Sequence, residues 1–208
     1  MFVVLEGIDG CGKSTVAQAL KEKVQDAIVV HAPTDSAKQR AIQGSSKAST
    51  LFIMLQDMIT IMQDIVIPAM LEGKSIIMDR FWPSTAVYQT QQINKFLCMP
   101  HTDIVELCAR AIGIALMESF AGDSEKIHDT YFKNPMHIFV LDVSVETAMK
   151  RAEERGNLDA FENVSKETIE ERRNIYLKMQ KNKDKYHVIP VDGKSVDDIV
   201  EEILSIAG

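Results

Sequence analysis

Cysteine is scarce in this 208-residue sequence, which contains only Cys11, Cys98 and Cys108. An odd number of cysteines without close metal-ligand spacing speaks against a disulfide framework and a zinc site, and is typical of a reducing compartment. The sequence also has no internal repeat, low-complexity tract or Pro/Gly/Ser-rich linker. Because 46% of the residues are apolar and 25% are charged, we expect one soluble domain, spanning residues 1–208, with a sizeable core.

An excess of positive charge is also missing, since 23 basic residues face 30 acidic ones and the formal net charge is −7. Binding of a nucleic-acid polymer needs a broad basic surface, so we expect no such partner, although a mononucleotide would need only a local cluster of cations. No signal peptide precedes the first apolar run, which favours a cytoplasmic protein. No Ser-His-Asp or Cys-His arrangement for nucleophilic catalysis is evident.

Only one long run, Leu51–Leu71, is apolar enough to suggest a membrane span. Gln-Asp pairs at positions 56–57 and 63–64 interrupt it, and a spanning helix would tolerate their charges poorly, so we expect no membrane partner. The two pairs share one helical face, and the apolar surface that remains is wider than one core-facing stripe requires. The run is therefore either a deeply buried helix or the interface of a homodimer.

Short apolar runs rich in β-branched residues alternate with helical patterns along the chain. This alternation predicts an α/β fold with a five-stranded parallel sheet covered by helices on both faces, and ligands bind at the carboxyl ends of such strands. The segment Asn94–Asn134 has no strand pattern; Thr102 can cap a helix through Leu116, but no role is predicted for the segment. The predicted strands are Phe2–Glu6, Ala27–His31, Ser75–Met78, His137–Asp142 and Tyr186–Val191.

A glycine-rich loop with the pattern G-x-x-x-x-G-K-S follows the first predicted strand and precedes a helical pattern. Its glycines let successive backbone N–H groups point at an anion, and the helix N-terminus adds its dipole. In such a P-loop, Lys13 would reach the terminal phosphates and the hydroxyl of Ser14 could bind magnesium. Cys11 is either a small loop filler or a redox-sensitive thiol. The predicted triphosphate-binding residues are Gly7, Ile8, Asp9, Gly10, Cys11, Gly12, Lys13, Ser14 and Thr15.

Asp79 and Arg80 follow the third predicted strand. An aspartate at a strand end near a P-loop suggests a magnesium ligand, and a neighbouring arginine can hold a second phosphate in a bidentate manner. The alternative is an ordinary surface Asp–Arg pair. Thr85 and Tyr88 lie about one helical turn apart in the next helix and can face the same cavity.

Arg151 and Arg155 are four residues apart, at the end of a helical pattern that a glycine closes. They could belong to a lid, at about residues 150–162, that closes over phosphates, or to a solvated helix end with Glu–Arg pairs. Transfer between two phosphates needs no general base, because the acceptor is already an anion; it needs cations that hold two repelling anions together. Four expected catalytic cations, Lys13, Arg80, Arg151 and Arg155, and two expected magnesium ligands, Ser14 and Asp79, meet this need.

At this point the sequence resembles the thymidylate kinase family, from Phe2 to about Ile206 but without Asn94–Asn134. The resemblance implies a homodimeric, Mg²⁺-dependent P-loop kinase that transfers the γ-phosphoryl group of ATP to a deoxynucleoside monophosphate, with dTMP as the expected acceptor. It rests on Phe2 to Thr15, on Asp79-Arg80 with Ser84 and Tyr88-Gln89, on Leu141 to Val143, on Arg151 to Asp159 with Glu162, and on Val188 to Asp192.

The resemblance also implies roles for single residues. Asp9 would lie near the sugar 3′-hydroxyl and the metal, and Arg80 would bind the acceptor phosphate. Thr85 would lie near the base, and Tyr88 under the sugar. Gly10 stands where some family members have a P-loop arginine, so the lid arginines would supply this charge.

Three departures from the family pattern concern the acceptor site. His31-Ala32-Pro33 replaces the usual Arg-Glu-Pro, and Arg40 is a candidate for the missing charge. The lid reads Asp159-Ala160 where an Asp-Arg pair is usual. The phenylalanine and arginine expected against the base become Phe52 and Gln56, or Met54 and Met58 when counted back from Asp79. The base preference therefore stays open.

Two other functions fit parts of the pattern. A deoxynucleoside kinase would need a carboxylate base near a sugar hydroxyl, for which Glu6 is a candidate. A nucleotide-binding switch specific for guanine would normally carry Asn-Lys-x-Asp, whereas Asn182-Lys183-Asp184 places the aspartate one position too early.

Overall fold

The computed structural model describes residues 1–43, 46–97, 101–120, 123–127, 129, 135–156, 161, 163–179 and 184–208. Five strands form one parallel sheet in the order β2-β3-β1-β4-β5, which confirms the predicted sheet. The strands differ from the predicted ranges by one residue at three ends. They are β1 (Phe2–Glu6), β2 (Ala27–His31), β3 (Ser75–Asp79), β4 (Met136–Asp142) and β5 (Tyr186–Pro190).

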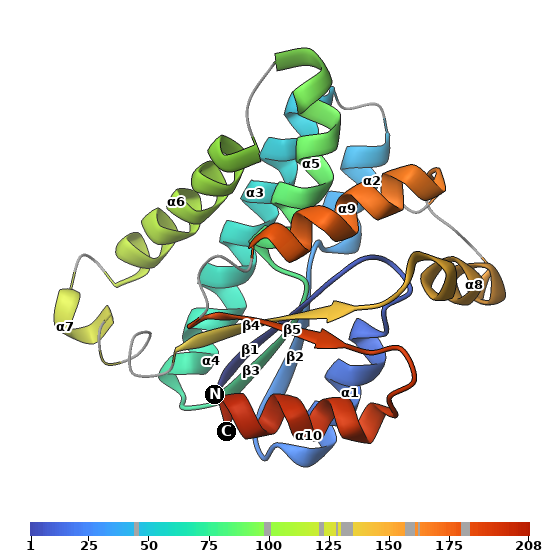
Figure 1. Cartoon of the computed structure of the whole chain (residues 1–208). Helices are drawn as coiled ribbons and strands as arrows, with labels where there is room; N and C mark the ends of the chain where they lie inside the picture. The colour runs from blue at the N-terminus through green and yellow to red at the C-terminus, as the bar shows by residue number, and fades with distance from the viewer. Residues whose placement is uncertain are drawn as a thin grey trace.

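Alternate residues of β1 point to opposite faces of the sheet and so belong to two different cores. Val3 and Leu5 pack with the helices α1 (Lys13–Lys23) and α10 (Val196–Ala207). Phe2 and Val4 pack on the other face, against the helical segments between residues 58 and 69 and the helix that contains Ile112. Figure 1 shows the two helical layers with the sheet between them. All five residues of β1 are buried, as expected for the central strand of a covered sheet.

The long apolar run forms three consecutive helical segments, α3 (Lys47–Ile61), the π-helical turn η1 (Met62–Val66) and α4 (Ile67–Leu71). By length and composition alone Lys47–Leu71 could cross a membrane, but 56% of its most apolar window is buried inside the protein. Several of its side chains, among them Met58 and Ile61, belong to the core under the sheet. This is the packing of a core helix in a soluble protein.

Except for the short α7, the remaining helices lie around the carboxyl ends of the strands and along one side of α3 (Figure 1). In the segment 94–134, α6 starts close to the predicted Thr102 and ends three residues after the predicted Leu116. Ile104 and Cys108 of α6 pack against Leu51 and Leu55 of α3, so this part of the segment serves the core. These helices are α2 (Asp35–Ile42), α5 (Trp82–Leu97), α6 (His101–Ser119), α7 (Ser124–Ile127), α8 (Val145–Arg155) and α9 (Lys166–Lys178).

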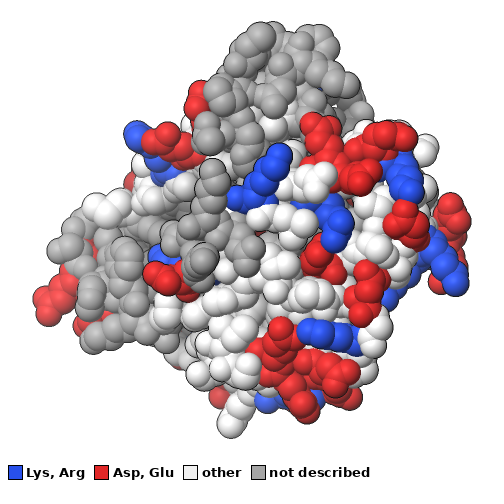
Figure 2. Space-filling model, in the orientation of Figure 1, with Lys and Arg blue, Asp and Glu red and all other residues white. Residues whose placement is uncertain are grey.

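Acidic and basic side chains are interspersed on the face shown in Figure 2, with acidic residues gathered over α10. Asp197, Asp198 and Glu201 of this helix are all exposed. Acidic residues in its first turn also oppose the positive end of the helix dipole, and Ser195 and Asp198 form a capping box.

Candidate active site

The P-loop places Lys13 at the first position of α1, behind Gly12, whose φ of 99° is in the left-handed region. The Lys13 ammonium donates to the carbonyl oxygens of Gly7 (3.1 Å) and Ile8 (2.9 Å), and contacts Cys11 Sγ at 3.4 Å. Cys11 is only 2% exposed and fills space under the loop, as the loop-filler interpretation predicted. The loop therefore curls around the Lys13 amine.

Gly10 explains why this P-loop carries no arginine. Its φ is 83°, and a Cβ at this position would meet the backbone of Ala148 in α8 at or below 3.1 Å. Arg151, one turn further along α8, donates from its guanidinium to the Gly10 carbonyl oxygen at 3.2 Å. A side chain at position 10 would clash with α8, and the positive charge at the P-loop comes from Arg151 of α8 instead.

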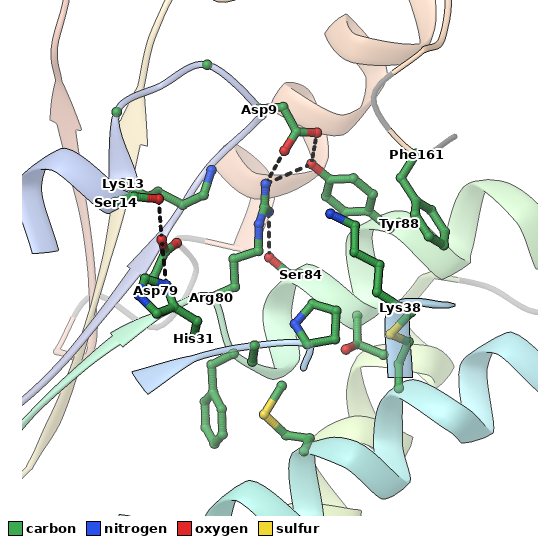
Figure 3. Close-up of a pocket in the computed structure, with 18 of the residues that line it drawn as sticks. Asp9, Lys13, Ser14, His31, Lys38, Asp79, Arg80, Ser84, Tyr88 and Phe161 are labelled. Carbon is green, nitrogen blue, oxygen red and sulfur yellow. Dashed lines mark hydrogen bonds and ion pairs between the residues drawn. The ribbon is translucent and has the colours of Figure 1, made fainter. Parts of the chain in front are cut away.

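Ser14, Asp79 and His31 meet where the P-loop faces the ends of β2 and β3 (Figure 3). Ser14 Oγ donates to Asp79 Oδ2 at 2.6 Å, and His31 Nδ1 lies 3.2 Å from the same oxygen. A hydroxyl and a carboxylate are the oxygen ligands that P-loop proteins offer to Mg²⁺, which takes its other ligands from water and phosphate. No group of three or more His, Cys, Asp or Glu suited to a metal occurs within the described part of the chain.

Arg80 is the centre of a second cluster, directly after β3 (Figure 3). Its guanidinium forms an ion pair with Asp9 and donates to Ser84 Oγ at 2.9 Å and to Tyr88 Oη at 3.3 Å. Tyr88 in turn donates to Asp9 Oδ2 at 2.6 Å. Burial acts to raise the pKa of Asp9, but the charges of Arg80 and Lys13 outweigh burial and hold this pKa below its ordinary value.

Glu6, the last residue of β1, anchors the backbone that carries Arg80. Its carboxylate accepts from the backbone N–H groups of Phe81 (2.8 Å) and Ser84 (3.3 Å), and from Ser84 Oγ at 2.6 Å. Glu6 is fully buried, and burial raises its pKa above the ordinary value. These bonds fix the start of α5, so Glu6 is occupied as a structural acceptor.

Arg172 of α9 is a site residue that the sequence did not reveal. It is 4% exposed, its guanidinium carbon lies 4.1 Å from the centroid of the Tyr88 ring, and it donates to the Phe161 carbonyl oxygen at 2.7 Å. It also lies 4.0 Å from Asp9 Oδ2. Because α9 is polar on most of its surface, its sequence did not indicate that one arginine is buried beside Tyr88 and Asp9.

One cavity of about 490 Å³ connects the P-loop with the Arg80 cluster, a size suited to a nucleotide-like ligand. Most of the predicted site residues line it, together with His31, Ala32, Pro33, Lys38, Met54, Met58, Phe81, Ser84, Gln89 and Phe161. Gly7, Ile8 and Cys11 lie behind the loop surface and are not among the lining residues. The predicted residues that line the cavity are Asp9, Gly10, Gly12, Lys13, Ser14, Thr15, Asp79, Arg80, Thr85, Tyr88, Arg151 and Arg155. Asp159, Ala160 and Glu162 of the expected lid lie outside the described residues.

Three predicted substrate-binding residues do not line the cavity. Phe52 is 62% exposed and Gln56 is exposed on the outer face of α3, while Arg40 is exposed on α2. Met54 and Met58 line the cavity instead, which is the alternative register. Residues two apart on a helix point in nearly opposite directions, so choosing positions 52 and 56 placed the predicted contacts on the wrong face.

Gln89 lines the cavity one residue after Tyr88 and is only 1% exposed. Among the described residues, its Oε1 is the one buried side-chain polar atom without a hydrogen-bond partner in the protein. Buried polar atoms are nearly always paired, so an unpaired acceptor on a cavity wall indicates a place for a ligand donor. The sequence contained this residue within the Tyr88-Gln89 motif, but gave it no role.

Comparison with known proteins agrees with the geometry. The family model for thymidylate kinase matches residues 5–105 and 119–203. The chain is 31% identical to a thymidylate kinase of Fervidobacterium nodosum, over 99% of this chain and 98% of that protein. It is 29% identical to a thymidylate kinase of Thermosipho africanus, over 99% and 96% of the two chains.

A solved structure shares the fold. The crystal structure of thymidylate kinase from Ehrlichia chaffeensis superposes with a TM-score of 0.65 at 22% identity, and the match covers 99% of this chain and 97% of that one. The chain has the P-loop NTPase fold and belongs to the thymidylate kinase family.

Proposed function

We propose that this protein phosphorylates dTMP to dTDP with ATP and Mg²⁺, a step of nucleotide biosynthesis. The observation that carries the proposal is the placement of cations around one cavity. Lys13 and Arg151 lie at the P-loop, and Arg80 lies at the end of β3 and lines the same space. Two anions that repel each other can meet only where cations hold both of them.

In this proposal ATP lies on the P-loop, along residues Gly7 to Thr15. Lys13 and the lid arginines Arg151 and Arg155 stabilise the charge that spreads over the transferred phosphoryl group. Ser14 and Asp79 hold Mg²⁺, which supplies further positive charge at the phosphates when bound. Arg80 holds the acceptor phosphate, whose oxygen attacks without a general base. The chain acts as one kinase domain.

The acceptor nucleoside lies between the Asp9–Tyr88 pair and α3. Asp9 and Tyr88 take the sugar, and the thymine ring packs against Met54 and Met58, whose thioethers adapt to a ring face. Gln89 then offers an acceptor and donors to the N3–H and O4 of thymine, an edge that an amide matches. Thr85, 7% exposed and on the same cavity wall, adds a hydroxyl.

The deoxynucleoside kinase alternative is weaker, because its candidate base is not available. Glu6 accepts three hydrogen bonds from Phe81 and Ser84 and is not among the cavity residues. The guanine-switch alternative lacks its Asn-Lys-x-Asp motif, because Asn182-Lys183-Asp184 places the aspartate one position too early. Asn182 and Lys183 lie outside the described residues.

The test is an assay of diphosphate formation with ATP and Mg²⁺ over a panel of deoxynucleoside monophosphates, with thymidine as an additional acceptor. Fastest turnover of dTMP supports the proposal. Equal or faster turnover of a monophosphate with another base overturns the thymine preference. Phosphorylation of thymidine itself, without use of dTMP, overturns the phosphate-acceptor reaction.

We also propose that the protein is a cytoplasmic homodimer that pairs through the outer face of α3 and η1. Phe52 and Ile65 are 62% and 45% exposed there, although each is a large apolar side chain. Burying them in a second copy would remove this surface from water. Sedimentation should give a dimer for the wild-type chain and a monomer for Phe52→Glu. A wild-type monomer at micromolar concentration would contradict the proposal.

A further inference from the structure

Five cations line the cavity among the described residues: Lys13 of the P-loop, Arg80 after β3, Arg151 and Arg155 of α8, and Lys38 of α2. A nucleoside monophosphate carries close to two negative charges at neutral pH. The Arg80 guanidinium faces it, but Arg80 is already ion-paired with Asp9. The end of β2 carries no arginine: it reads His31-Ala32-Pro33, and His31 contacts Asp79 on the P-loop side. Lys13 belongs to the P-loop and Arg151 contacts it, so Lys38 is the lining cation that can join Arg80 at the acceptor phosphate.

Lys38 is the cation that the fold supplies there. It lies in α2, on the chain that continues from the end of β2, and it lines the same cavity as Arg80 and Tyr88. In Figure 3 the Lys38 side chain reaches into the cavity from the side opposite Lys13, with its amine near the Tyr88 ring in this view and Arg80 between the two lysines. Arg40, two residues further along α2, is exposed and is not a lining residue.

Hydrogen bonds between α3 and the first residue before α2 hold the start of α2 in place. Asp57 of α3 accepts from the Thr34 backbone N–H at 2.8 Å and from Thr34 Oγ1 at 2.5 Å. Thr34 is the N-cap of α2 and accepts from the Ala37 N–H at 3.3 Å. Ala37 is fully buried against its neighbours, so the next residue, Lys38, stands at the edge of the packed face. Thr34 and Asp57 thus hold the first turn of α2 against α3, and neither residue lines the cavity.

We propose that Lys38 of α2 is the second cation for the acceptor phosphate, beside Arg80. The inference rests on the proposed function, because it requires a monophosphate acceptor. A lysine fits this task from a helix, since its flexible stem brings a single charge to a phosphate without the fixed fork that an arginine needs. Arg80 then offers the paired N–H donors of its guanidinium to the phosphate, and Lys38 offers the single charge of its ammonium group.

The experiment compares a ligand that has the phosphate with one that lacks it. Binding of dTMP and of thymidine to the whole chain is measured by calorimetry, and KM is measured for dTMP and for ATP. In Lys38→Ala we expect affinity for dTMP to fall about 10- to 100-fold, the range for a lost hydrogen bond to a charged group. Affinity for thymidine and the KM for ATP should stay within about twofold, because neither involves this phosphate.

Three further variants make the result specific. Lys38→Arg should restore most of the dTMP affinity, since it returns the charge. Lys21→Ala removes an exposed lysine of α1 and should leave both affinities unchanged. Arg40→Ala tests the other α2 cation, and a larger loss of dTMP affinity there than in Lys38→Ala would overturn the inference. An unfolding midpoint of Lys38→Ala equal to that of the wild type shows that the helix is intact.

Failure of this inference differs from failure of the proposed function. If the wild-type chain phosphorylates dTMP while Lys38→Ala keeps the full preference for dTMP over thymidine, the inference falls and the kinase proposal stands. If Lys38→Ala lowers the affinities for dTMP and for thymidine by the same factor, the inference is also overturned, because the residue would then act on the nucleoside or on the fold. A wild-type chain that cannot use dTMP overturns the proposed function, and the role of Lys38 with it.

Discussion

Replacing Arg80 by alanine and, separately, by glycine tests the acceptor half of the site and the backbone that carries it. Arg80 is one of two non-glycine residues with positive φ among the described residues, and its φ is 73°. Its guanidinium contacts Asp9, Tyr88, Ser84 and the Gly7 carbonyl oxygen. The alanine variant removes these contacts and keeps a Cβ, whereas the glycine variant also removes the Cβ.

The expected catalytic loss is the same for both variants. A single preorganised donor to developing charge is worth roughly 3–4 kcal/mol, which is a hundredfold to a thousandfold in rate. Among the described residues Arg80 is the arginine at the end of β3 that lines the cavity, so we expect kcat/KM for dTMP to fall by about a hundredfold or more in both variants. Affinity for ATP should change much less, because the P-loop loses only the hydrogen bond from Arg80 to the Gly7 carbonyl oxygen.

Stability should separate the two variants. Both lose the ion pair with the mostly buried Asp9, a loss of about 2 kcal/mol for a hydrogen bond to a charged group. A Cβ in the left-handed region costs roughly 1–2 kcal/mol, while glycine costs roughly 0.5–1 kcal/mol through the entropy of the unfolded chain. Arg80→Gly should therefore be more stable than Arg80→Ala by about 0.5–1 kcal/mol.

Initial rates of ADP formation and urea unfolding curves measure the two effects. A rate for Arg80→Ala within about threefold of the wild type would refute the placement of the acceptor phosphate at Arg80. An alanine variant at least as stable as the glycine variant would refute the argument from φ. The two refutations are independent, since one concerns the guanidinium and the other the backbone.

Further expectations concern the P-loop and the metal ligands. Lys13→Ala should lower kcat by about a hundredfold, as for other lost transition-state donors, while circular dichroism stays that of the wild type. Asp79→Asn should raise the Mg²⁺ concentration for half-maximal rate, measured by titration at saturating ATP, because an amide is a weaker ligand than a carboxylate; an unchanged requirement would place the metal elsewhere. Asp9→Asn should change how the free energy of unfolding depends on pH in the acid range. Burial acts to raise the pKa of Asp9, yet the surrounding cations keep it below the ordinary value of 3.8 in the folded state. Such a carboxyl stabilises the fold above its unfolded pKa and loses this contribution as pH falls through the folded pKa. The difference in unfolding free energy between wild type and Asp9→Asn should therefore be constant near neutral pH and shrink below about pH 4; a difference that persists unchanged to lower pH would contradict this assignment.

The sequence alone determined the features that depend on neighbours in the chain. The five strands follow from short apolar runs, and the P-loop follows from the spacing of Gly7, Gly12 and Lys13 between a strand and a helix. Parallel strands present their carboxyl ends at one edge, so Asp79 and Arg80 were predicted beside the P-loop before their contacts were known. The structure brings them there, with Ser14 bonded to Asp79.

The tertiary structure alone decided which face of each helix turns toward the cavity. Met54 and Met58 rather than Phe52 and Gln56 line it because Leu51 and Leu55 pack against Ala86, Ile104 and Cys108, which fixes the rotation of α3. Helical spacing gives the faces but not their direction, since direction depends on contacts between segments far apart in the chain.

The same reason explains Lys38, Glu6 and Arg172. In the sequence, Lys38 and Arg40 are both basic residues of the same helical segment. In the structure, where Thr34 is hydrogen-bonded to Asp57, Lys38 lines the cavity and Arg40 does not. Glu6 is a carboxylate near a predicted site, and only the positions of Phe81 and Ser84 make it a structural acceptor. Local sequence therefore determined which chemical groups the site contains, and long-range packing decided which of them point into it.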